Sequence, residues 1–536
     1  MNFTPDRKKT MTIISYEFLL FVIFFILIYY IFPKRAQWWV ILAGNVVFYA
    51  FSGFENLLIV LATSASSYFF SERMQQNLRK QDELTAGLDR KEARVIKEQM
   101  KKSRKKLLVA ALVIAIGVLA FLKYYNFAIH SINSILGAEK LPGLQLIAPL
   151  GISYYTFMLV SYLVDVYNGK VRVEKNPARF FAYILYFPQI SQGPIARYNE
   201  VAPQIFASHS YDFDTVRKGL LLMVWGFFKK LVIANRLSSY SINIANPGNG
   251  VVGAALLLGP LMFSVQVYCD FSGCMDIVRG LSECLGINLS ENFERPYFSE
   301  TLPEFWRRWH ISLGAFFREY VFYPVSTTKL FLKLNTKSRK LFGSEAGRVI
   351  ASCLPIMCVW LLTGLWHGAA TNYIAWGLYH GVLICLSTAI EKPSAIWCEK
   401  LHINRENRVW KLFRMLRTFF LCLIGRIFFI TDSVSHSLYV FKSIFANLGI
   451  FSISSELLPS AKSTAVILAG CLLLLCVSIV QERRKKRGET ATIRDWLLGR
   501  SLPIRWAVIV SGVIMILVLG IYGPNTNAST FVYFQF

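Results

Sequence analysis

Two histidines each follow a tryptophan directly, in segments whose residue types could carry proton-transfer chemistry. His310 lies in residues 305–313, FWRRWHISL, and His367 lies in residues 363–369, TGLWHGA. Helical spacing would place Trp306 and His310 one turn apart on the same face. The glycines around His367 would allow close approach of another backbone. Imidazole is the side chain best suited to moving a proton near neutral pH, so both histidines are candidate general acid–base groups.

A structural role is the alternative for every histidine. Ionisable groups at membrane depth are costly and mark functional sites, but a histidine bonded to a carbonyl beside a tryptophan of the aromatic belt would give the same pattern. Neither His310 nor His367 has an H-x-x-x-H or H-E-x-x-H companion, so no metal site is predicted. The other histidines lie at span ends or in polar loops and are expected to be structural: His130, His209, His380, His402 and His436.

The composition indicates what kind of chain must position these residues. Of 536 residues, 54% are hydrophobic and only 17% are charged, against about 25% charged in a typical soluble domain. The net charge of +26 comes from basic residues that fall between long apolar runs rather than on one face, which argues against nucleic acid as a partner and for basic loops held at a membrane surface. The ten cysteines form no C-x-x-C pair and predict neither a zinc site nor a disulfide framework.

Twelve apolar runs approach the length of about 20 residues that a membrane-crossing helix needs. The sequence therefore predicts an all-α polytopic membrane protein with about 11–12 transmembrane helices. Residues 180–194 hold a shorter apolar run with two prolines and a glycine, which predicts a broken or re-entrant segment. The twelve runs are residues 13–32, 37–52, 56–70, 107–122, 146–167, 220–234, 251–269, 349–365, 373–390, 412–430, 465–480 and 506–522.

Basic clusters predict the orientation through the positive-inside rule. If the charged segment 72–106 is cytoplasmic, the three preceding spans put the N-terminus outside, and an even number of spans puts the C-terminus outside too. Three basic residues at positions 7–9 would then break the rule. A translation start at Met11 would remove them, and N-terminal sequencing of the mature protein would decide this. The clusters expected inside are residues 34–35, 329–348, 392–417 and 483–487.

Polar motifs recur along the chain: PLGISYYTF (149–157), FPQ (187–189), GPI (193–195), DFSG (270–273), ENF (291–293), RPY (295–297), EFWRRWHISL (304–313), FREY (317–320), WHG (366–368) and WGLYHG (376–381). Taken together, these motifs resemble the membrane-bound O-acyltransferase family, in particular its bacterial alginate O-acetylation branch. The resemblance covers nearly the whole chain. Cys274, Asn235 and the intramembrane Arg426 depart from the usual pattern, which bears on substrate detail because pocket residues sort substrates.

The resemblance implies transfer of an acyl group from a thioester to a hydroxyl, with the family's two histidines mapping onto His367 and His310. His367 is expected to act as the general base, and His310 to orient the substrate or polarise the carbonyl. For Asp270 and Ser272, near the inner end of a predicted span, helix-capping and hydrogen bonding are the structural alternative. The residues expected to bind substrate or line the pore are Trp306, Arg307, Arg308, Trp309, Trp366, Asp270, Ser272, Asn292 and Gln189.

The resemblance also implies an organisation and a set of partners. His367 and His310 are predicted to lie on opposite sides of the membrane. A site that both share would therefore require the funnel described for this family. The donor would be acetyl-CoA or another acyl thioester, used as a substrate with no bound cofactor. The acceptor would be an exported or cell-surface polysaccharide, reached through an extracytoplasmic SGNH-hydrolase-like partner at the plasma or inner membrane. Five parts are expected: N-terminal transmembrane helices (13–71), a charged cytoplasmic segment (72–106), the family's catalytic core (107–390), a cytoplasmic loop (391–411) and C-terminal transmembrane helices (412–536). The last part ends in an aromatic tail, residues 531–536, that is expected to face outwards.

Two rival functions remain open. The D-alanyl branch of the same family takes an aminoacyl group from a carrier-protein thioester for teichoic acid modification, and a carrier and its ligase encoded nearby would favour it. A transporter or flippase would also have many spans, a broken helix and an intramembrane arginine. The Trp-His motifs weigh against a transporter, and full function after loss of both histidines would revive it.

Overall fold

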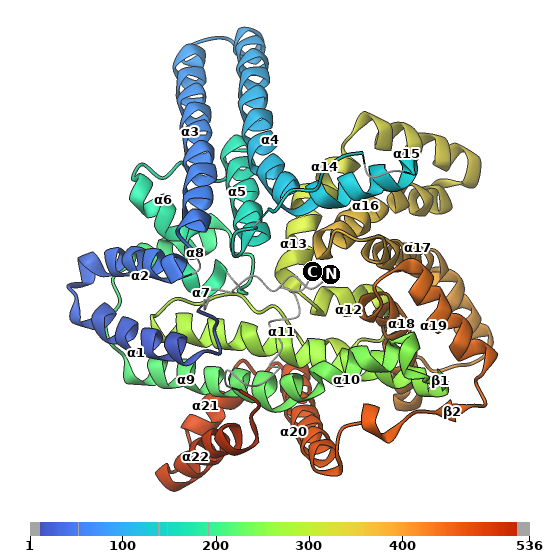
Figure 1. The fold of residues 1–536 in the computed structure, drawn as a ribbon. Coiled ribbons are helices and arrows are strands. Elements are labelled where there is room, and N and C mark those ends of the chain that lie inside the picture. Colours follow the sequence, from blue (N-terminus) through green and yellow to red (C-terminus); the bar gives the residue numbers. More distant parts are fainter. Residues whose placement is uncertain (1–10, 52, 138–139, 147, 191, 523–536) are drawn as a thin grey trace. The chain divides into compact units, whose positions relative to one another are not determined.

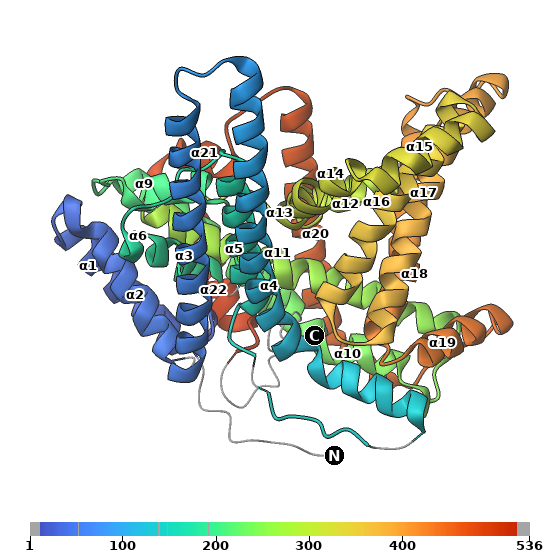
Figure 2. The same ribbon diagram turned by 90° about the horizontal axis from the view of Figure 1, so that it is seen from above.

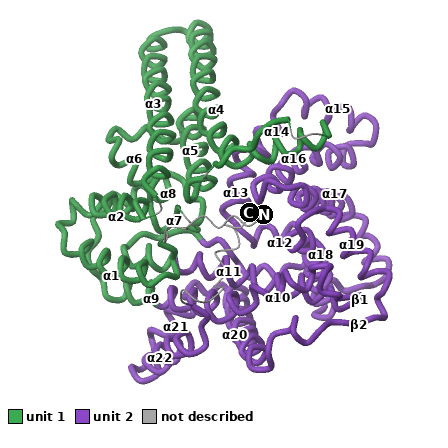
Figure 3. Tube along the Cα trace, viewed as in Figure 1, with its two compact units in different colours: residues 1–220, 278–290 green, residues 221–277, 291–536 purple. Residues whose placement is uncertain are grey.

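The protein was analysed as a computed structural model that describes residues 11–51, 53–137, 140–146, 148–190 and 192–522. It is almost entirely helical, which confirms an all-α membrane protein. The chain forms two compact units (Figure 3). Unit 1 holds residues 1–220 and 278–290, and unit 2 holds residues 221–277 and 291–536. The aromatic tail at 531–536 and the basic residues at 7–9 lie outside the described residues.

Unit 1 is built around two long helices, α3 and α4, which form a hairpin and lie side by side (Figures 1 and 2). Helices α9 (Phe213–Phe227) and α11 (Leu258–Cys284) contribute to both units. The helices of unit 1 are α1 (Tyr16–Ile31), α2 (Gln37–Phe51), α3 (Phe54–Thr85), α4 (Arg90–Leu136), α5 (Ile152–Tyr167), α6 (Pro177–Ile184), α7 (Phe187–Ile190) and α8 (Tyr198–Phe206), with the 3₁₀ turn η1 (Lys34–Ala36).

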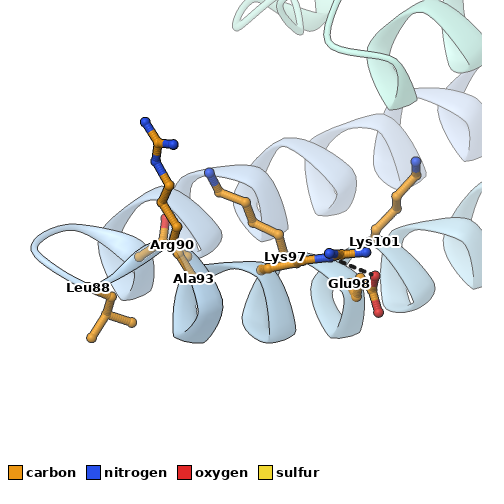
Figure 4. Close-up of a pocket in the computed structure, with 8 residues that line it drawn as sticks. Leu88, Arg90, Ala93, Lys97, Glu98 and Lys101 are labelled. Atoms are coloured by element: carbon orange, nitrogen blue, oxygen red, sulfur yellow. Dashed lines mark ion pairs between the residues drawn. The ribbon is translucent and has the colours of Figure 1, made fainter.

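The charged segment 72–106 forms the far ends of α3 and α4. Asp89 begins α4 by accepting hydrogen bonds from the backbone N–H groups of Lys91 and Glu92, at 2.8 and 2.7 Å. A pocket whose lining includes four basic residues lies at this tip (Figure 4). The lining residues are Thr85, Leu88, Arg90, Ala93, Arg94, Lys97, Glu98 and Lys101.

The predicted break in the 180–194 segment is present in unit 1. Helix α6 ends at Ile184, and the short helix α7 begins at Phe187. Buried Asn45 of α2 bridges the break, because its amide donates to the Ala182 carbonyl at 3.0 Å and accepts from the Phe187 N–H at 2.8 Å. One side chain thus satisfies two backbone groups that the break would leave unpaired.

Replacing Asn45 by alanine should therefore destabilise the protein by about 1–3 kcal/mol per buried group left without a partner. The measurement is the melting temperature of the purified protein in detergent. Asn126 is a matched control, because it makes the same pair of bonds to Leu144, at 2.8 and 2.9 Å, but is exposed to solvent. Equal losses in the Asn45→Ala and Asn126→Ala variants would contradict this prediction.

Unit 2 contains the remaining helices and one short antiparallel strand pair, with Val252 opposite Ser452 and Gly253 opposite Phe451. Two of its helical segments are π-helices, η2 (Phe228–Ala234) and η6 (Arg318–Phe322). Its α-helices are α10 (Asn235–Ala245), α12 (Leu302–Arg308), α13 (Ile311–Phe317), α14 (Tyr323–Ser326), α15 (Lys329–Phe342), α16 (Ser344–His367), α17 (Thr371–Lys400), α18 (Arg408–Ile430), α19 (Val434–Ala446), α20 (Ala461–Lys486), α21 (Ile493–Leu498) and α22 (Leu502–Leu519). Its strands are β1 (Val252–Gly253) and β2 (Phe451–Ser452), and its 3₁₀ turns are η3 (Pro247–Asn249), η4 (Ala254–Leu257), η5 (Pro296–Phe298) and η7 (Ser455–Leu457).

Each of the twelve predicted runs overlaps a helix, but fewer are long and apolar enough to cross a membrane unaided. Within the described residues six helical segments meet that standard, and α1 is apolar but shorter. Helix α22 buries none of its residues, although its hydropathy is high. An apolar helix with exposed sides is suited to lipid rather than water. The six segments are Arg90–Leu136, Ala254–Cys284, Ser344–His367, Thr371–Lys400, Ala461–Lys486 and Leu502–Leu519.

Candidate active site

The chain turns sharply at His310, so the prediction that Trp306 and His310 share one helical face is wrong. Helix α12 ends at Arg308, and His310 has a left-handed backbone with φ of 47°. Trp309 pairs with Phe293 in an isolated antiparallel bridge, and the Ile311 N–H donates to the Asn292 carbonyl at 3.0 Å. These backbone contacts hold the turn in a conformation that a non-glycine residue rarely adopts.

Asn292 holds the His310 ring in one orientation. The Asn292 side-chain oxygen accepts from the Ser312 N–H at 2.9 Å, and its amide nitrogen lies 3.1 Å from Nδ1 of His310. The amide oxygen also lies 3.3 Å from Nδ1, but because it already accepts from Ser312, we assign the amide N–H as the donor to Nδ1. This assignment leaves the imidazole proton on Nε2.

His310 is therefore expected to act as a neutral hydrogen-bond donor. Its side chain is 3% exposed, and within the described part of the chain Nε2 has no hydrogen-bond partner. Burial lowers the pKa of His310 to about 3, because the charged imidazolium would lose its hydration. A buried N–H without a partner is a costly group that a substrate oxygen could satisfy.

His367 is the last residue of α16 and is buried against α17 and α18. Helices α16 and α17 approach closely at glycines: a Cβ on Gly364 would lie 2.5 Å from the Tyr373 carbonyl oxygen. The His367 ring centroid lies 4.7 Å from that of Trp376 and 5.0 Å from that of Phe429. The helix end thus places the imidazole in an aromatic cluster rather than in a loop.

One indole links the two predicted histidines. The Trp366 ring centroid lies 4.7 Å from that of His367 and 5.6 Å from that of His310. The ring centroid of Phe271 of α11 also lies 4.7 Å from that of His310. Residues 57 positions apart in sequence are therefore parts of one buried cluster within unit 2.

A third histidine, His380, belongs to the same cluster, although its place in the sequence predicted only a structural role. It lies inside α17, one turn after Trp376, and is 1% exposed rather than at a span end. Its ring centroid lies 4.8 Å from that of Trp306 and 4.9 Å from that of Trp376. The four-residue spacing from Trp376 within an apolar run was the signal that could have identified it.

Gly425 of α18 lies directly against His380. A Cβ at this position would be 2.6 Å from Nε2 of His380. The Gly425→Ala variant should therefore displace the imidazole, lower transferase activity and destabilise the protein by about 1–3 kcal/mol through overpacking. The measurements are transferase activity and melting temperature in detergent. Gly117→Ala is the control, because Gly117 is a helical residue with open space around it. A Gly425→Ala variant as active and as stable as Gly117→Ala would contradict the packing.

The acidic and hydroxyl residues predicted on α11 face lysines of the π-helix η2. They lie inside the helical segment 254–284 rather than at the end of a span. Asp270 forms an ion pair with Lys230, and both side chains are almost fully buried. Lys229 Nζ donates to Ser272 at 2.9 Å and pairs with Asp276 at 2.7 Å. This geometry favours the structural interpretation of Asp270 and Ser272.

The other residues predicted to bind substrate or line the pore lie in different environments. Trp306 packs against Trp360 and His380 in the cluster. Arg307 is exposed, whereas Arg308 pairs with Glu304 at 2.8 Å and with Glu482 of α20 at 3.4 Å. Gln189 lies in unit 1, where its amide nitrogen is 3.1 Å from the Met158 sulfur.

The cluster offers buried imidazoles as proton-transfer groups. Within the described ranges no three His, Cys, Asp or Glu side chains are grouped to hold a metal ion. Buried imidazoles surrounded by aromatic rings make a low-dielectric site, where hydrogen bonds and charges act strongly. Such a site suits acyl transfer, in which a proton leaves a hydroxyl and charge develops on a carbonyl oxygen.

Comparisons with known proteins identify the class of reaction. Residues 171–342, which include Asn292 and His310, match the model of the membrane-bound O-acyltransferase family. The chain is 29% identical to the probable alginate O-acetylase AlgI of Pseudomonas aeruginosa, over 76% of this chain and 69% of that protein. It is 26% identical to the peptidoglycan O-acetyltransferase of Helicobacter pylori, over 77% and 74% of the two chains. It is 32% identical to the teichoic acid D-alanyltransferase of Bacillus subtilis, over 52% of this chain and 68% of that protein. The chain therefore belongs to the membrane-bound O-acyltransferase family and is a multi-pass membrane O-acyltransferase.

Proposed function

We propose that this acyltransferase passes an acetyl group from a cytoplasmic thioester, acetyl-CoA, across the membrane towards a hydroxyl of an exported or cell-surface polysaccharide. The observation that carries the proposal is the buried contact of both His310 and His367 with the Trp366 indole. The relatives named for alginate and peptidoglycan O-acetylation support acetyl as the acyl group and a polysaccharide as the acceptor.

In the proposed reaction His367 is the general base. The acceptor hydroxyl oxygen forms a bond to the thioester carbonyl carbon while its proton moves to the His367 imidazole. The carbonyl π electrons move onto the carbonyl oxygen, to which the Nε2–H of His310 donates a hydrogen bond. When the carbon–sulfur bond breaks, the electron pair leaves with sulfur, and the resulting thiolate takes the proton from His367.

Transfer across the membrane requires access from two sides. Basic clusters and apolar runs predict a plasma- or inner-membrane protein with both termini outside and the donor on the cytoplasmic side. An extracytoplasmic SGNH-hydrolase-like partner would then deliver the acetyl group to the polysaccharide. On this proposal CoA is a substrate, and the enzyme holds no resident cofactor.

A carrier-protein thioester is the second candidate donor. The Bacillus subtilis relative is named a teichoic acid D-alanyltransferase, and the tip of the α3–α4 hairpin carries Arg90, Arg94, Lys97 and Lys101. An acidic carrier would be attracted to such a surface. CoA, with its phosphates, would be attracted as well, so the donor has to be tested directly.

Membranes that contain the protein and its co-encoded partners would be supplied with radiolabelled acetyl-CoA or with labelled D-alanyl carrier protein. The proposal predicts label in the cell-surface glycan from acetyl-CoA only, with loss of label in His367→Ala. His130→Ala is the matched control, because His130 is exposed on α4. Label from the carrier alone would replace the proposal with D-alanyl transfer. Label from acetyl-CoA that His367→Ala leaves unchanged would remove His367 from the mechanism.

A further inference from the structure

Arg426 is a buried cation in the apolar second half of helix α18, and the mechanism above does not use it. Its side chain is 4% exposed. Within the described part of the chain it forms no ion pair with a carboxylate, although its guanidinium hydrogen-bonds to the Tyr297 hydroxyl. Other cations of unit 2 differ, since Lys230 pairs with Asp270 and Arg295 pairs with Glu482 at 2.8 Å.

The guanidinium of Arg426 lies over two aromatic rings of the site, those of Trp309 and Phe429. Its Cζ is 4.7 Å from the ring centroid of Trp309, the residue that precedes His310. It is 6.0 Å from the ring centroid of Phe429, whose ring packs on His367 at 5.0 Å. The Phe429 ring therefore lies near both Arg426 and His367, Arg426 also packs on the residue before His310, and all five residues belong to unit 2.

A buried cation without a counter-charge destabilises the folded state. A buried charge without a counter-charge loses its hydration, and the loss is recovered only where an opposite charge or good hydrogen bonds replace water. The faces of Trp309 and Phe429 supply part of the missing stabilisation through cation–π attraction. A guanidinium keeps its proton in any such site, so the positive charge persists until an anion arrives.

We propose that Arg426 is an anion site of the transferase, which stabilises the negative charge on the thioester carbonyl oxygen during transfer. This inference rests on the proposed acyl-transfer mechanism. In that step the hydroxyl oxygen bonds to carbon, His367 holds the proton, and the carbonyl oxygen carries one negative charge. His310 supplies a neutral hydrogen bond to that oxygen, and Arg426 supplies the counter-charge. Arg426 gives up no proton and forms no covalent bond.

The test compares Arg426→Met and Arg426→Lys with wild type, in both transfer kinetics and melting temperature. A charge used only when the anion forms should affect kcat more than KM. Arg426→Met should lower kcat by about 100-fold with little change in KM, and should melt at the wild-type temperature or above it because a buried charge that has no counter-charge is gone. Arg426→Lys should retain more kcat than Arg426→Met, because it keeps the charge.

A control on the same helix separates this role from a structural one. Arg414 pairs with Glu300 at 2.7 Å, so Arg414→Met should lower the melting temperature and leave kcat unchanged. The proposal is overturned if Arg426→Met keeps kcat within threefold of wild type, if it raises only KM, or if it melts below wild type. The comparison of melting temperatures needs no acyl donor. It therefore tests the role of Arg426 even if the donor is a thioester other than acetyl-CoA. Absence of wild-type transfer from acetyl-CoA would instead count against the proposed function alone.

Discussion

The Asn292→Asp variant is expected to lose acyl transfer at alkaline pH and to recover part of it as the pH falls. In the wild type, the Asn292 amide donates to Nδ1 of His310 and leaves the proton on Nε2. An aspartate at this position can only accept, so a neutral His310 would carry its proton on Nδ1 and present a bare Nε2 to the carbonyl oxygen. Loss of one such donor costs about 100- to 1,000-fold in kcat.

The pH dependence of Asn292→Asp follows from the effect that a negative charge at position 292 has on the pKa of His310. Burial holds the pKa of the wild-type His310 at about 3, so wild-type His310 stays neutral across the working pH range. A neighbouring carboxylate raises the pKa of an imidazole. Below the raised pKa, His310 is an imidazolium with protons on both nitrogens, and donation from Nε2 returns. Above the raised pKa, that donation is lost.

Steady-state transfer by Asn292→Asp would be measured from about pH 5.5 to 9 at matched levels of folded protein. The aspartate can still accept from the Ser312 N–H, so the turn that holds His310 should persist, and a wild-type melting temperature would confirm it. A variant whose kcat stays within tenfold of wild type at pH 9 would contradict the tautomer assigned to His310.

Loss of His367 should have the second large effect. A positioned general base contributes about 100- to 10,000-fold to the rate, so His367→Ala should lower kcat by that order and leave donor binding nearly unchanged. His367→Gln is a useful companion, because it keeps a polar side chain near Trp376 and Phe429 but cannot take up the proton. Rates of transfer from labelled donor, at matched expression in membranes, are the measurement. Equal activity in His367→Gln and wild type would contradict the role of general base.

The helices of this protein could be predicted from sequence far better than the geometry of its site. Apolar runs and basic clusters are local signals, and each of the twelve runs overlaps a helix. The break before Phe187 was also predictable, because prolines and a glycine gather there. In contrast, six helical segments among the described residues are long and apolar enough to span a membrane, because several runs lie in short helices or in helices that bury polar residues.

The histidine pair was predicted from residue types, but its arrangement depends on contacts distant in sequence. His310 turns out of the helix because the Asn292 segment, 18 residues earlier, pins the backbone on both sides of it. Helical periodicity carries no information about such a contact. Lys229 and Lys230 were missed for a similar reason, since they are buried and paired with α11 carboxylates although sequence alone places lysines at a surface.

The central claim is that His310 and His367 act on the same bound thioester. The most direct test is a double-mutant cycle that measures kcat/KM for acyl transfer in wild type, His310→Ala, His367→Ala and the double variant, with melting temperatures as a check on folding. Groups that act in one step are strongly non-additive. We predict that each single variant loses at least about 100-fold and that the double variant is little worse than the poorer single one. Single variants that retain wild-type transfer, or losses that add independently in the double variant, would contradict a shared site.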